Sequence, residues 1–425
     1  MDDYSLRVLD AVLDTYQPLL PAIELYGAKA VGKTETARRR AASTLRLDLT
    51  ANRERLGADP ALLRSLPGPL LVDEWPRVPE SWDLVRRAVD DGAPPGRFLL
   101  TGSATVPKGV SVHSGAGRII RMRMRPMTLA ERGVGHPTVS VKEVLTGQDS
   151  VGGHTDVRLA DYTHEIVASG FPGIRTEPDM IRRMLLDSYL DDLVQREFPE
   201  QGYPVRKPAV LRAWLAAYAA ATASTASYSA ILDASTPGET DKPAKTTTMA
   251  YRDALSQLWM LDLLEPWRPT GTRLQSLGQA PKHFLADPAL ACRLLNVSEH
   301  QLLQGDQGSR ETTLGDATLL GALFEHLSVL CVRVYAQASD ASVFHMRTHR
   351  GEHEVDMILQ TEDGKILPVE VKLSQSVTDK DVRHILWLKK NLGESYLPGV
   401  VITTGEYAYR RTDGIAVVPL ALLGP

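Results

Sequence analysis

Short apolar runs alternate with amphipathic helical patterns over about the first 130 residues of the chain. This alternation is typical of a parallel sheet whose strands are connected by helices. Trp82–Val89 places its apolar residues at helical spacing. The predicted strands are Ile23–Tyr26, Leu45–Leu49, Leu70–Val72 and Phe98–Leu100. The sequence therefore predicts an α/β domain over residues 1–133.

The pattern changes after this first domain. Residues 134–204 are predicted to be a helical lid or connector. Within it, the polar, glycine-rich stretch Gly147–Thr155 predicts a loop, and Met180–Phe198 predicts a helix with one apolar side.

Residues 205–300 show short helical patterns and then two strand candidates, Met260–Trp267 and His283–Leu285, on either side of the turn Arg268–Gly278. Helices followed by a hairpin are the order of a winged helix. The recognition-helix candidate starts near Thr246, after the loop Ala234–Pro243. It carries Lys245 and Arg252, and Lys242 lies just before it. They could contact phosphates, but winged helices also serve as packing or docking modules, and both interpretations stay open.

Residues 301–425 again mix helices and strands, which predicts a second α/β domain. Helices are predicted from Leu319 and over Asp379–Asn391. The predicted strands are Ser342–Met346, Glu354–Gln360, Ile366–Leu373 and Gly399–Thr403.

Composition adds limits to this picture. With 425 residues, 43% hydrophobic and 24% charged, the chain is typical of a globular protein of several domains. A net charge of −4 gives no overall attraction to nucleic acid. Cys292 and Cys331 lie far apart in apolar surroundings, which favours buried thiols in a reducing compartment. No apolar signal segment and no uncharged stretch of bilayer length is present, so we expect a cytoplasmic protein that does not enter a membrane.

A glycine-containing segment joins the first predicted strand to a helix. Its pattern, Gly-x-x-x-x-Gly-Lys-Thr, is that of the phosphate-binding loop of nucleoside triphosphatases. The segment consists of Gly27, Ala28, Lys29, Ala30, Val31, Gly32, Lys33 and Thr34, and Glu35 follows it. Glycines let backbone N–H groups approach phosphates closely, at the positive end of the helix dipole. Lys33 is predicted to reach the β- and γ-phosphates and Thr34 to ligate Mg²⁺, so ATP and Mg²⁺ are the expected ligands.

Paired carboxylates follow the predicted strand Leu70–Val72, about forty residues after this loop. In such ATPases the first acid, here Asp73, helps hold Mg²⁺, and the second, Glu74, polarises the attacking water. Ser103 follows the next apolar strand and could orient the water or sense the γ-phosphate, with Thr101 as a second candidate.

Arginine alternates with apolar residues over Arg118–Arg125, which is typical of a half-buried strand with most of its arginines on a solvated face. Arg118 follows the small residues Gly115, Ala116 and Gly117. A loop arginine there could reach transition-state charge, either in its own subunit or in a neighbouring subunit of a homo-oligomer. A purely structural role stays open.

Two acids and a lysine are predicted on adjoining strands of the C-terminal domain. Glu370 and Lys372 share one strand face, and Asp356 joins them across a tight hairpin turn. This is the pattern of an Asp…Glu-x-Lys nuclease site, with Glu325 as an additional acid on a helix; the acids would bind Mg²⁺. The alternative is an ordinary antiparallel pair with an exposed charged face.

His345, His349 and His353 recur every fourth residue. On a helix this spacing would suit metal ligands, but their surroundings predict strands, which favours surface histidines beside a DNA-facing edge.

The serial order of these motifs resembles one group of proteins, the prokaryotic AAA-type ATPases that carry a C-terminal domain of unknown function. The resemblance covers nearly the whole chain. It is carried by Gly27–Thr34, Leu70–Trp75, Leu100–Ala104, Gly117–Arg118, Arg125–Met127, Ser169–Pro172 and Pro281–Asp287. Pro76 departs from the group, whose members commonly have glutamine there. The resemblance implies an AAA-like P-loop core, a winged helix and a restriction-endonuclease-like domain of the PD-(D/E)xK type.

These observations predict an ATP-hydrolysing protein whose nucleotide state controls the winged-helix and nuclease-like module. Nucleic acid, DNA rather than RNA, is a candidate partner of that module. Two alternatives remain: a nucleotide-switched scaffold with an inactive nuclease-like domain, and an active metal-dependent nuclease.

Overall fold

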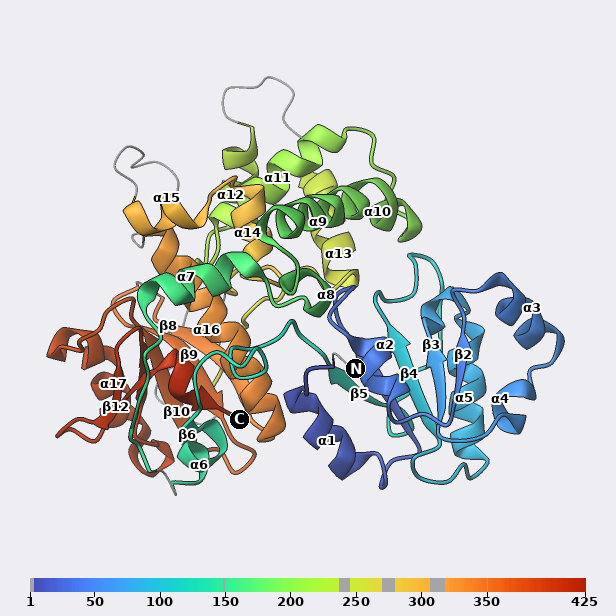
Figure 1. The fold of residues 1–425 in the computed structure, drawn as a ribbon, viewed down its shortest axis with the longest axis horizontal. Helices are drawn as coiled ribbons and strands as arrows, with labels where there is room; N and C mark the ends of the chain where they lie inside the picture. The colour runs from blue at the N-terminus through green and yellow to red at the C-terminus, as the bar shows by residue number, and fades with distance from the viewer. Residues whose placement is uncertain (1–3, 148–149, 237–244, 270–279, 306–317, 350) are drawn as a thin grey trace.

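Three units pack side by side in the structure, a computed structural model that describes residues 4–147, 150–236, 245–269, 280–305, 318–349 and 351–425. An N-terminal α/β unit lies on the right of Figure 1, a helical region lies above, and a C-terminal α/β unit lies on the left. Some predictions fall wholly or largely outside the described residues. They concern the loop Ala234–Pro243, the turn Arg268–Gly278 and Lys242.

A five-stranded, fully parallel sheet forms the N-terminal unit, in the order β2-β3-β4-β1-β5. Its strands are β1 (Ala22–Tyr26), β2 (Ser43–Arg46), β3 (Leu70–Asp73), β4 (Phe98–Gly102) and β5 (Ile120–Arg123). The accompanying helices are α1 (Val8–Tyr16), α2 (Lys33–Arg38), α3 (Thr50–Ala58), α4 (Leu62–Ser65), the 3₁₀ turn η1 (Trp75–Arg77) and α5 (Glu80–Asp90). The predicted parallel α/β core is confirmed.

The central strands β3 and β4 are buried along their whole length because helices cover both faces of the sheet. Successive side chains alternate between faces. Leu70 and Phe98 pack with Trp82 of α5 on one face. Leu71 and Leu99 belong to the core on the other face, with residues of α1.

The helical region follows, with Met180–Phe198 as its longest predicted helix. Its elements are α7 (Leu159–Ala168), α8 (Pro172–Arg175), α9 (Asp179–Asp192), the π-helical turn η2 (Leu193–Glu197), α10 (Phe198–Glu200), α11 (Pro208–Ala220), α12 (Tyr228–Ser235), α13 (Lys245–Gln257), α14 (Pro288–Leu294) and α15 (Glu299–Gln304). The short helix α6 (Val141–Thr146) precedes them and lies beside the C-terminal unit (Figure 1). The predicted long helix widens into the π turn η2, where the Phe198 N–H donates to the Leu193 carbonyl. Pro199 gives the reason, since it lacks an N–H and its ring would collide with a carbonyl of a regular α-helix.

Three helices, α11 to α13, precede the two predicted strands of the middle region. Isolated antiparallel bridges join Leu261 to Leu285 and Leu264 to Lys282, so the described ends of the predicted hairpin do pair. On α13, Arg252 pairs with Asp253 at 3.0 Å and lies over the ring of Tyr228, so its charge is met within the chain.

A mixed seven-stranded sheet forms the C-terminal unit, in the order β7-β12-β13-β11-β10-β9-β8. Its strands are β7 (Gly153–His154), β8 (Ser342–Arg347), β9 (Glu354–Gln360), β10 (Ile366–Val371), β11 (Val400–Thr403), β12 (Tyr407–Arg410) and β13 (Ala416–Pro419). Strands β8, β9 and β10 are antiparallel neighbours, whereas β11 runs parallel to β10 and β13. The helices α16 (Leu319–Ala338) and α17 (Asp379–Leu392) and the 3₁₀ turns η3 (Gly393–Ser395) and η4 (Leu420–Leu422) complete the unit.

Two short strands of the connector join C-terminal elements, which the sequence did not predict. Gly153–His154, placed in the predicted loop Gly147–Thr155, is strand β7 and pairs with β12. Strand β6 (Val139–Ser140) pairs with β14 (Leu423–Gly424). The loop prediction is therefore wrong at this edge, because main-chain pairing there depends on a partner about 250 residues away.

Helix α16 is, among the described helices, long and apolar enough to cross a membrane by length and composition. However, 72% of its most apolar stretch is buried inside the protein, as expected for a core helix.

One buried carboxylate connects the three units. Asp262, from the helical region, accepts Arg125 at 2.7 Å, Arg123 at 2.9 Å and Arg333 of α16 at 3.0 Å. Burial alone would raise the pKa of Asp262, but the three guanidinium charges lower it well below its ordinary value. The prediction of a solvated arginine face is thus wrong for Arg123 and Arg125, because their partner lies far away in the sequence.

Candidate nucleotide-binding site

The glycine-rich loop Gly27–Thr34 connects the carboxyl end of β1 to α2. Its backbone enters the left-handed region at Ala30, with φ +66°, and at Gly32, with φ +103°. A Cβ on Gly27 would lie 2.1 Å from the Met124 carbonyl oxygen, so no other residue fits there without a backbone shift. The loop geometry therefore depends on the glycines that the motif requires.

Backbone N–H groups of this loop are available to a ligand. Within the described part of the chain, the backbone N–H groups from Lys29 to Glu35 donate to no protein acceptor. The Glu35 side chain points to Arg38 of the same helix, with which it pairs at 2.8 Å. An oxyanion is the natural partner of such a run of N–H donors.

Lys33 is buried and folds back onto its own loop. Its ammonium donates to the carbonyls of Gly27 at 2.9 Å and Ala28 at 2.7 Å. Burial lowers the pKa of Lys33 to about 8, although the charges of Glu74 and Asp73 oppose this shift. The side chain is held beside the space where the loop would receive phosphates.

ATP affinity is expected to fall as pH rises above 8. The free loop releases the Lys33 proton near pH 8, whereas bound phosphates favour the charged form, so binding above pH 8 takes up a proton. The expected loss is up to about tenfold per pH unit, with little change from Lys33 below pH 8. Titration of a fluorescent ATP analogue from pH 7 to 9.5 measures it. Lys33→Arg, which stays charged, serves as the control, and a flat wild-type profile would contradict the interpretation.

Asp73 ends β3 directly beside α2. Its Oδ1 accepts the Thr34 hydroxyl at 2.8 Å and the Thr101 hydroxyl at 2.5 Å. Asp73 is buried and Thr34 is exposed. The two residues predicted to share a metal ion are therefore in direct contact, and Thr101 orients the carboxylate.

Glu74 adopts a left-handed backbone conformation, with φ 54° and ψ 48°. Such a conformation is strained for a residue with a side chain and is often found at functional sites. Its carboxylate accepts the Ser103 hydroxyl, from the loop after β4, at 2.7 Å. The structure thus brings Ser103 to Glu74, as the sequence predicts.

Arg118 lies elsewhere. Ile23 of β1 pairs with Ile120 of β5, so Arg118 precedes the amino end of β5, whereas the glycine-rich loop follows the carboxyl end of β1. Its guanidinium pairs with Asp90 at 2.9 Å. The structure does not support a role for Arg118 within its own subunit, and a role in a neighbouring subunit stays a prediction.

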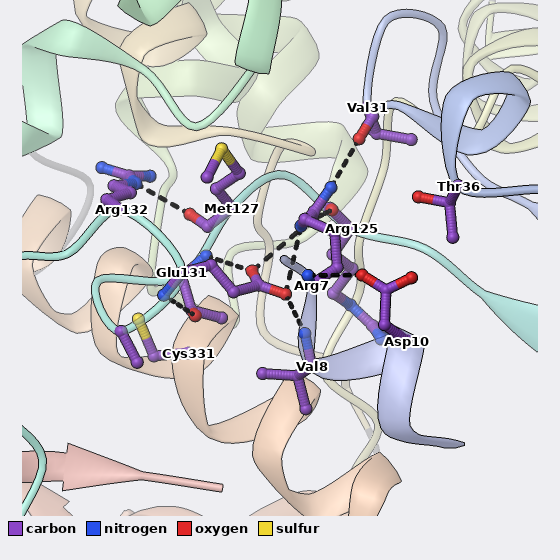
Figure 2. Close-up of polar contacts among 12 residues, drawn as sticks. Arg7, Val8, Asp10, Val31, Thr36, Arg125, Met127, Glu131, Arg132 and Cys331 are labelled. Carbon is purple, nitrogen blue, oxygen red and sulfur yellow. Dashed lines mark hydrogen bonds and ion pairs between the residues drawn. The ribbon is translucent and has the colours of Figure 1, made fainter. Parts of the chain in front are cut away.

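A buried arginine that the sequence motifs did not reveal supports the loop from behind (Figure 2). Arg7 donates to the Val31 carbonyl at 2.7 Å and to the Arg125 carbonyl at 2.7 Å. It also pairs with Glu131 at 3.1 Å, and Glu131 accepts the backbone N–H of Val8 at 2.7 Å. The only local signal was a lone arginine between two apolar residues at the start of a helix.

The helical region covers the other side of the loop. Lys29 pairs with Glu197 of the π turn at 2.6 Å, and the Tyr189 hydroxyl lies 3.3 Å from the Lys29 carbonyl oxygen. These residues line a cavity of about 130 Å³ that also includes Ser103 and Met260. The loop, Ser103 after β4 and the π turn therefore face one space.

The predicted C-terminal site residues also come together, but around a cation supplied by the chain. Lys282 donates to Glu325 at 2.9 Å and to Asp356 at 2.9 Å. Lys372 pairs with Glu370 at 2.9 Å. Among the described residues, no group of three or more histidine, cysteine or acidic side chains is arranged to hold a metal ion. Lys282 lies in a motif noted in the sequence, but nothing local indicated its position.

The three histidines do not converge. His345 is buried and lies 2.9 Å from the Ala280 carbonyl oxygen, and His349 is exposed. His353 stacks on Trp387 and contacts His384 at 3.2 Å. Their spacing is therefore no metal-ligand pattern.

Three segments of the chain match known families. Residues 21–132 match an AAA domain, residues 159–301 a domain of unknown function (DUF8612), and residues 320–423 another domain of unknown function (DUF4143). The N-terminal unit is thus a P-loop ATPase domain of the AAA class, and the functions of the two domains that follow it are unknown.

Relatives along the whole chain are distant. The uncharacterized protein Rv2008c of Mycobacterium tuberculosis is 25% identical over 408 residues, which cover 94% of this chain and 80% of the relative. The uncharacterized protein Mb2031c of Mycobacterium bovis matches equally well.

Two solved structures are also similar. The Walker-type ATPase paby2304 of Pyrococcus abyssi has a TM-score of 0.40 and 15% identity, covering 67% of this chain and 94% of that one. The ORC2 protein of Aeropyrum pernix has a TM-score of 0.26 and 14% identity, covering 68% and 90%. Similarity this low supports no inference about what this chain binds.

Proposed function

We propose that this protein binds and hydrolyses ATP with Mg²⁺ at the glycine-rich loop. The observation that carries the proposal is the convergence of Thr34, Asp73, Glu74 and Ser103 at adjacent strand ends. These residues come from three separate segments and supply the parts that phosphoryl transfer needs.

The donor set at Thr34 and Asp73 fits Mg²⁺. A hydroxyl and a carboxylate oxygen lie in contact, and oxygen ligands from one or two side chains are typical of protein-bound Mg²⁺. Thr34 and Asp73 would hold the ion, which would neutralise charge on the β- and γ-phosphates. Lys33 would turn from its own loop carbonyls to the same phosphates.

Glu74 is the proposed base that takes a proton from the attacking water. Its carboxylate projects from the end of β3 beside Asp73, and Ser103 holds one of its oxygens. The position of Ser103 supports a role in orienting Glu74 and the water rather than in contacting metal. The cavity next to Ser103 leaves room for water at this point.

Nucleotide occupancy is proposed to reach the rest of the chain through the contacts of the loop. Lys29 pairs with Glu197 of the helical region, and phosphates would compete for the Lys29 ammonium. Behind the loop, Arg125 connects to Asp262, which also holds Arg333 of the C-terminal unit. Each contact joins the ATPase domain to an element that could shift when nucleotide binds or leaves.

The C-terminal sheet is proposed to be a restriction-endonuclease-like domain. The order α16, β8, β9, β10, α17, β11, with three antiparallel strands and then a parallel one, supports this assignment.

The protein is also proposed to be cytoplasmic. The buried free cysteines Cys292 and Cys331 support this location.

Phosphate release by the purified chain tests the central proposal. Lys33→Ala is expected to abolish detectable ATP binding and turnover, because it removes the buried loop ammonium that would turn from the Gly27 and Ala28 carbonyls to the phosphates. Lys142→Ala, at an exposed lysine of α6, is the matched control and should behave like wild type. ATP turnover that survives Lys33→Ala would refute the site.

A further inference from the structure

A buried lysine lies where the helical region meets the C-terminal sheet. The Lys282 side chain is 2% exposed. Its ammonium lies 2.9 Å from Glu325 of α16, 2.9 Å from Asp356 of β9 and 3.1 Å from Glu354 of the same strand. An ammonium has three N–H donors, so three carboxylates satisfy it completely.

The backbone around Lys282 holds this ammonium in place. Its N–H and carbonyl both bond to Leu264, at 2.9 Å and 3.0 Å. The next residue, His283, is buried, with one ring nitrogen 3.2 Å from the Tyr218 hydroxyl and the other 2.7 Å from the Ala226 carbonyl oxygen. The helical region therefore provides the lysine, whereas the C-terminal unit provides the acids, from α16 and β9.

Carboxyl groups outnumber ammonium groups at this point, since Lys282 and Lys372 meet four of them. Glu370 is buried beside Asp356, and one of its oxygens, Oε1, has no hydrogen-bond partner among the described residues. The other oxygen accepts Lys372 at 2.9 Å. An unpartnered buried oxygen next to two further carboxylates indicates a place built for a cation.

We infer that Lys282 is a tethered cation that occupies the position of a divalent metal ion between Glu325 and Asp356. Metal binding by these acids and docking of the helical region on the sheet then exclude each other. A second cation within a few ångströms of a buried ammonium would be strongly repelled, because the interior screens charge poorly. The acids become available to metal only when the segment that carries Lys282 withdraws.

This inference does not depend on ATP hydrolysis, so it can fail or hold separately from the proposed function. The C-terminal acids keep the ability to bind metal, but they are not always accessible to it, because the helical region controls access to them.

Binding of Mn²⁺ to the full chain, followed by electron paramagnetic resonance without nucleotide, tests the inference. All proteins carry Asp73→Asn, so that the ATPase site adds no signal. With Lys282 intact, Asp356→Asn is expected to leave Mn²⁺ affinity unchanged. Lys282→Met is expected to bind Mn²⁺ at least tenfold more tightly, and the double variant Lys282→Met/Asp356→Asn should lose that gain. Lys142→Met is the matched control and should show none.

Two results would overturn the inference. One is Mn²⁺ binding by the chain with Lys282 intact that Asp356→Asn weakens, since the site would then be open already. The other is a folded Lys282→Met protein that binds Mn²⁺ no better. If Lys282→Met does not fold, the comparison of Asp356 with Asn in the presence of Lys282 still decides between a masked site and an open one. Lys282→Gln, which keeps a polar group, is the second variant.

Discussion

Glu74→Gln is expected to reduce ATP turnover by about 10²- to 10⁴-fold while ATP binding persists, as expected for loss of a general base. Glutamine has the same side-chain shape as glutamate. We expect it to keep the left-handed backbone conformation that Glu74 adopts, with φ 54°. It can still accept the Ser103 hydroxyl, which lies 2.7 Å from Glu74. The substitution therefore removes the charge that activates water and little else.

Steady-state phosphate release and binding of a fluorescent ATP analogue measure the two effects separately. Glu80→Gln is the matched control, because Glu80 is an exposed acid at the start of α5 and should tolerate the same substitution without loss. Turnover at the wild-type rate in Glu74→Gln would refute its role as the base. Tight ATP binding without phosphate release in the wild type would instead support the nucleotide-switched scaffold.

Asp262→Ala is expected to destabilise the protein by about 3–5 kcal/mol, since it leaves the buried Arg125 and the largely buried Arg123 and Arg333 without their shared carboxylate. Arg123 and Arg125 come from the ATPase domain and Arg333 from the C-terminal unit, and all three pair with this acid. Burial lowers the pKa of Arg333 to about 9 even with Asp262 present. Loss of the Asp262 carboxylate should therefore weaken the contact between the ATPase domain and the C-terminal unit. It should also lower the stability of each of these units.

Thermal unfolding is expected to show a drop in Tm on the order of 10 °C for Asp262→Ala. The matched control is Asp91→Ala, which removes an exposed partner of Arg64 and should cost about 0–1 kcal/mol. Limited proteolysis would locate the change, with faster cleavage between the units expected. Equal Tm values for the two variants would contradict the connecting role of Asp262.

The ATPase core was predictable because its information is local. The loop, the acids after β3 and Ser103 each follow an apolar strand, and parallel strands bring their carboxyl ends to one edge. The arrangement of the site residues then follows from the order of the strands along the chain. The strained backbone of Glu74 and the contact of Lys33 with its own loop carbonyls could not be predicted. Both depend on the exact positions of backbone atoms, which the residue types alone do not determine.

Residues whose partners lie far away were missed or misinterpreted. Arg7 reaches Glu131, and Arg125 reaches Asp262, 137 positions further on. Their local patterns indicated an ordinary helix start and an exposed arginine face. The C-terminal acids were found from strand alternation, but Lys282 comes from another unit, so the cation between them could not be inferred from strand patterns.

The pairing of β7 with β12 affects how this protein can be divided for study. A fragment that begins at residue 301 would lack β7 and leave β12 as an open sheet edge, next to the exposed rings of Tyr407 and Tyr409. Unpaired edges with exposed aromatic side chains tend to pair with other copies and aggregate. A soluble fragment of the C-terminal unit therefore has to carry residues 134–154 as well, joined by a linker that replaces the helical region.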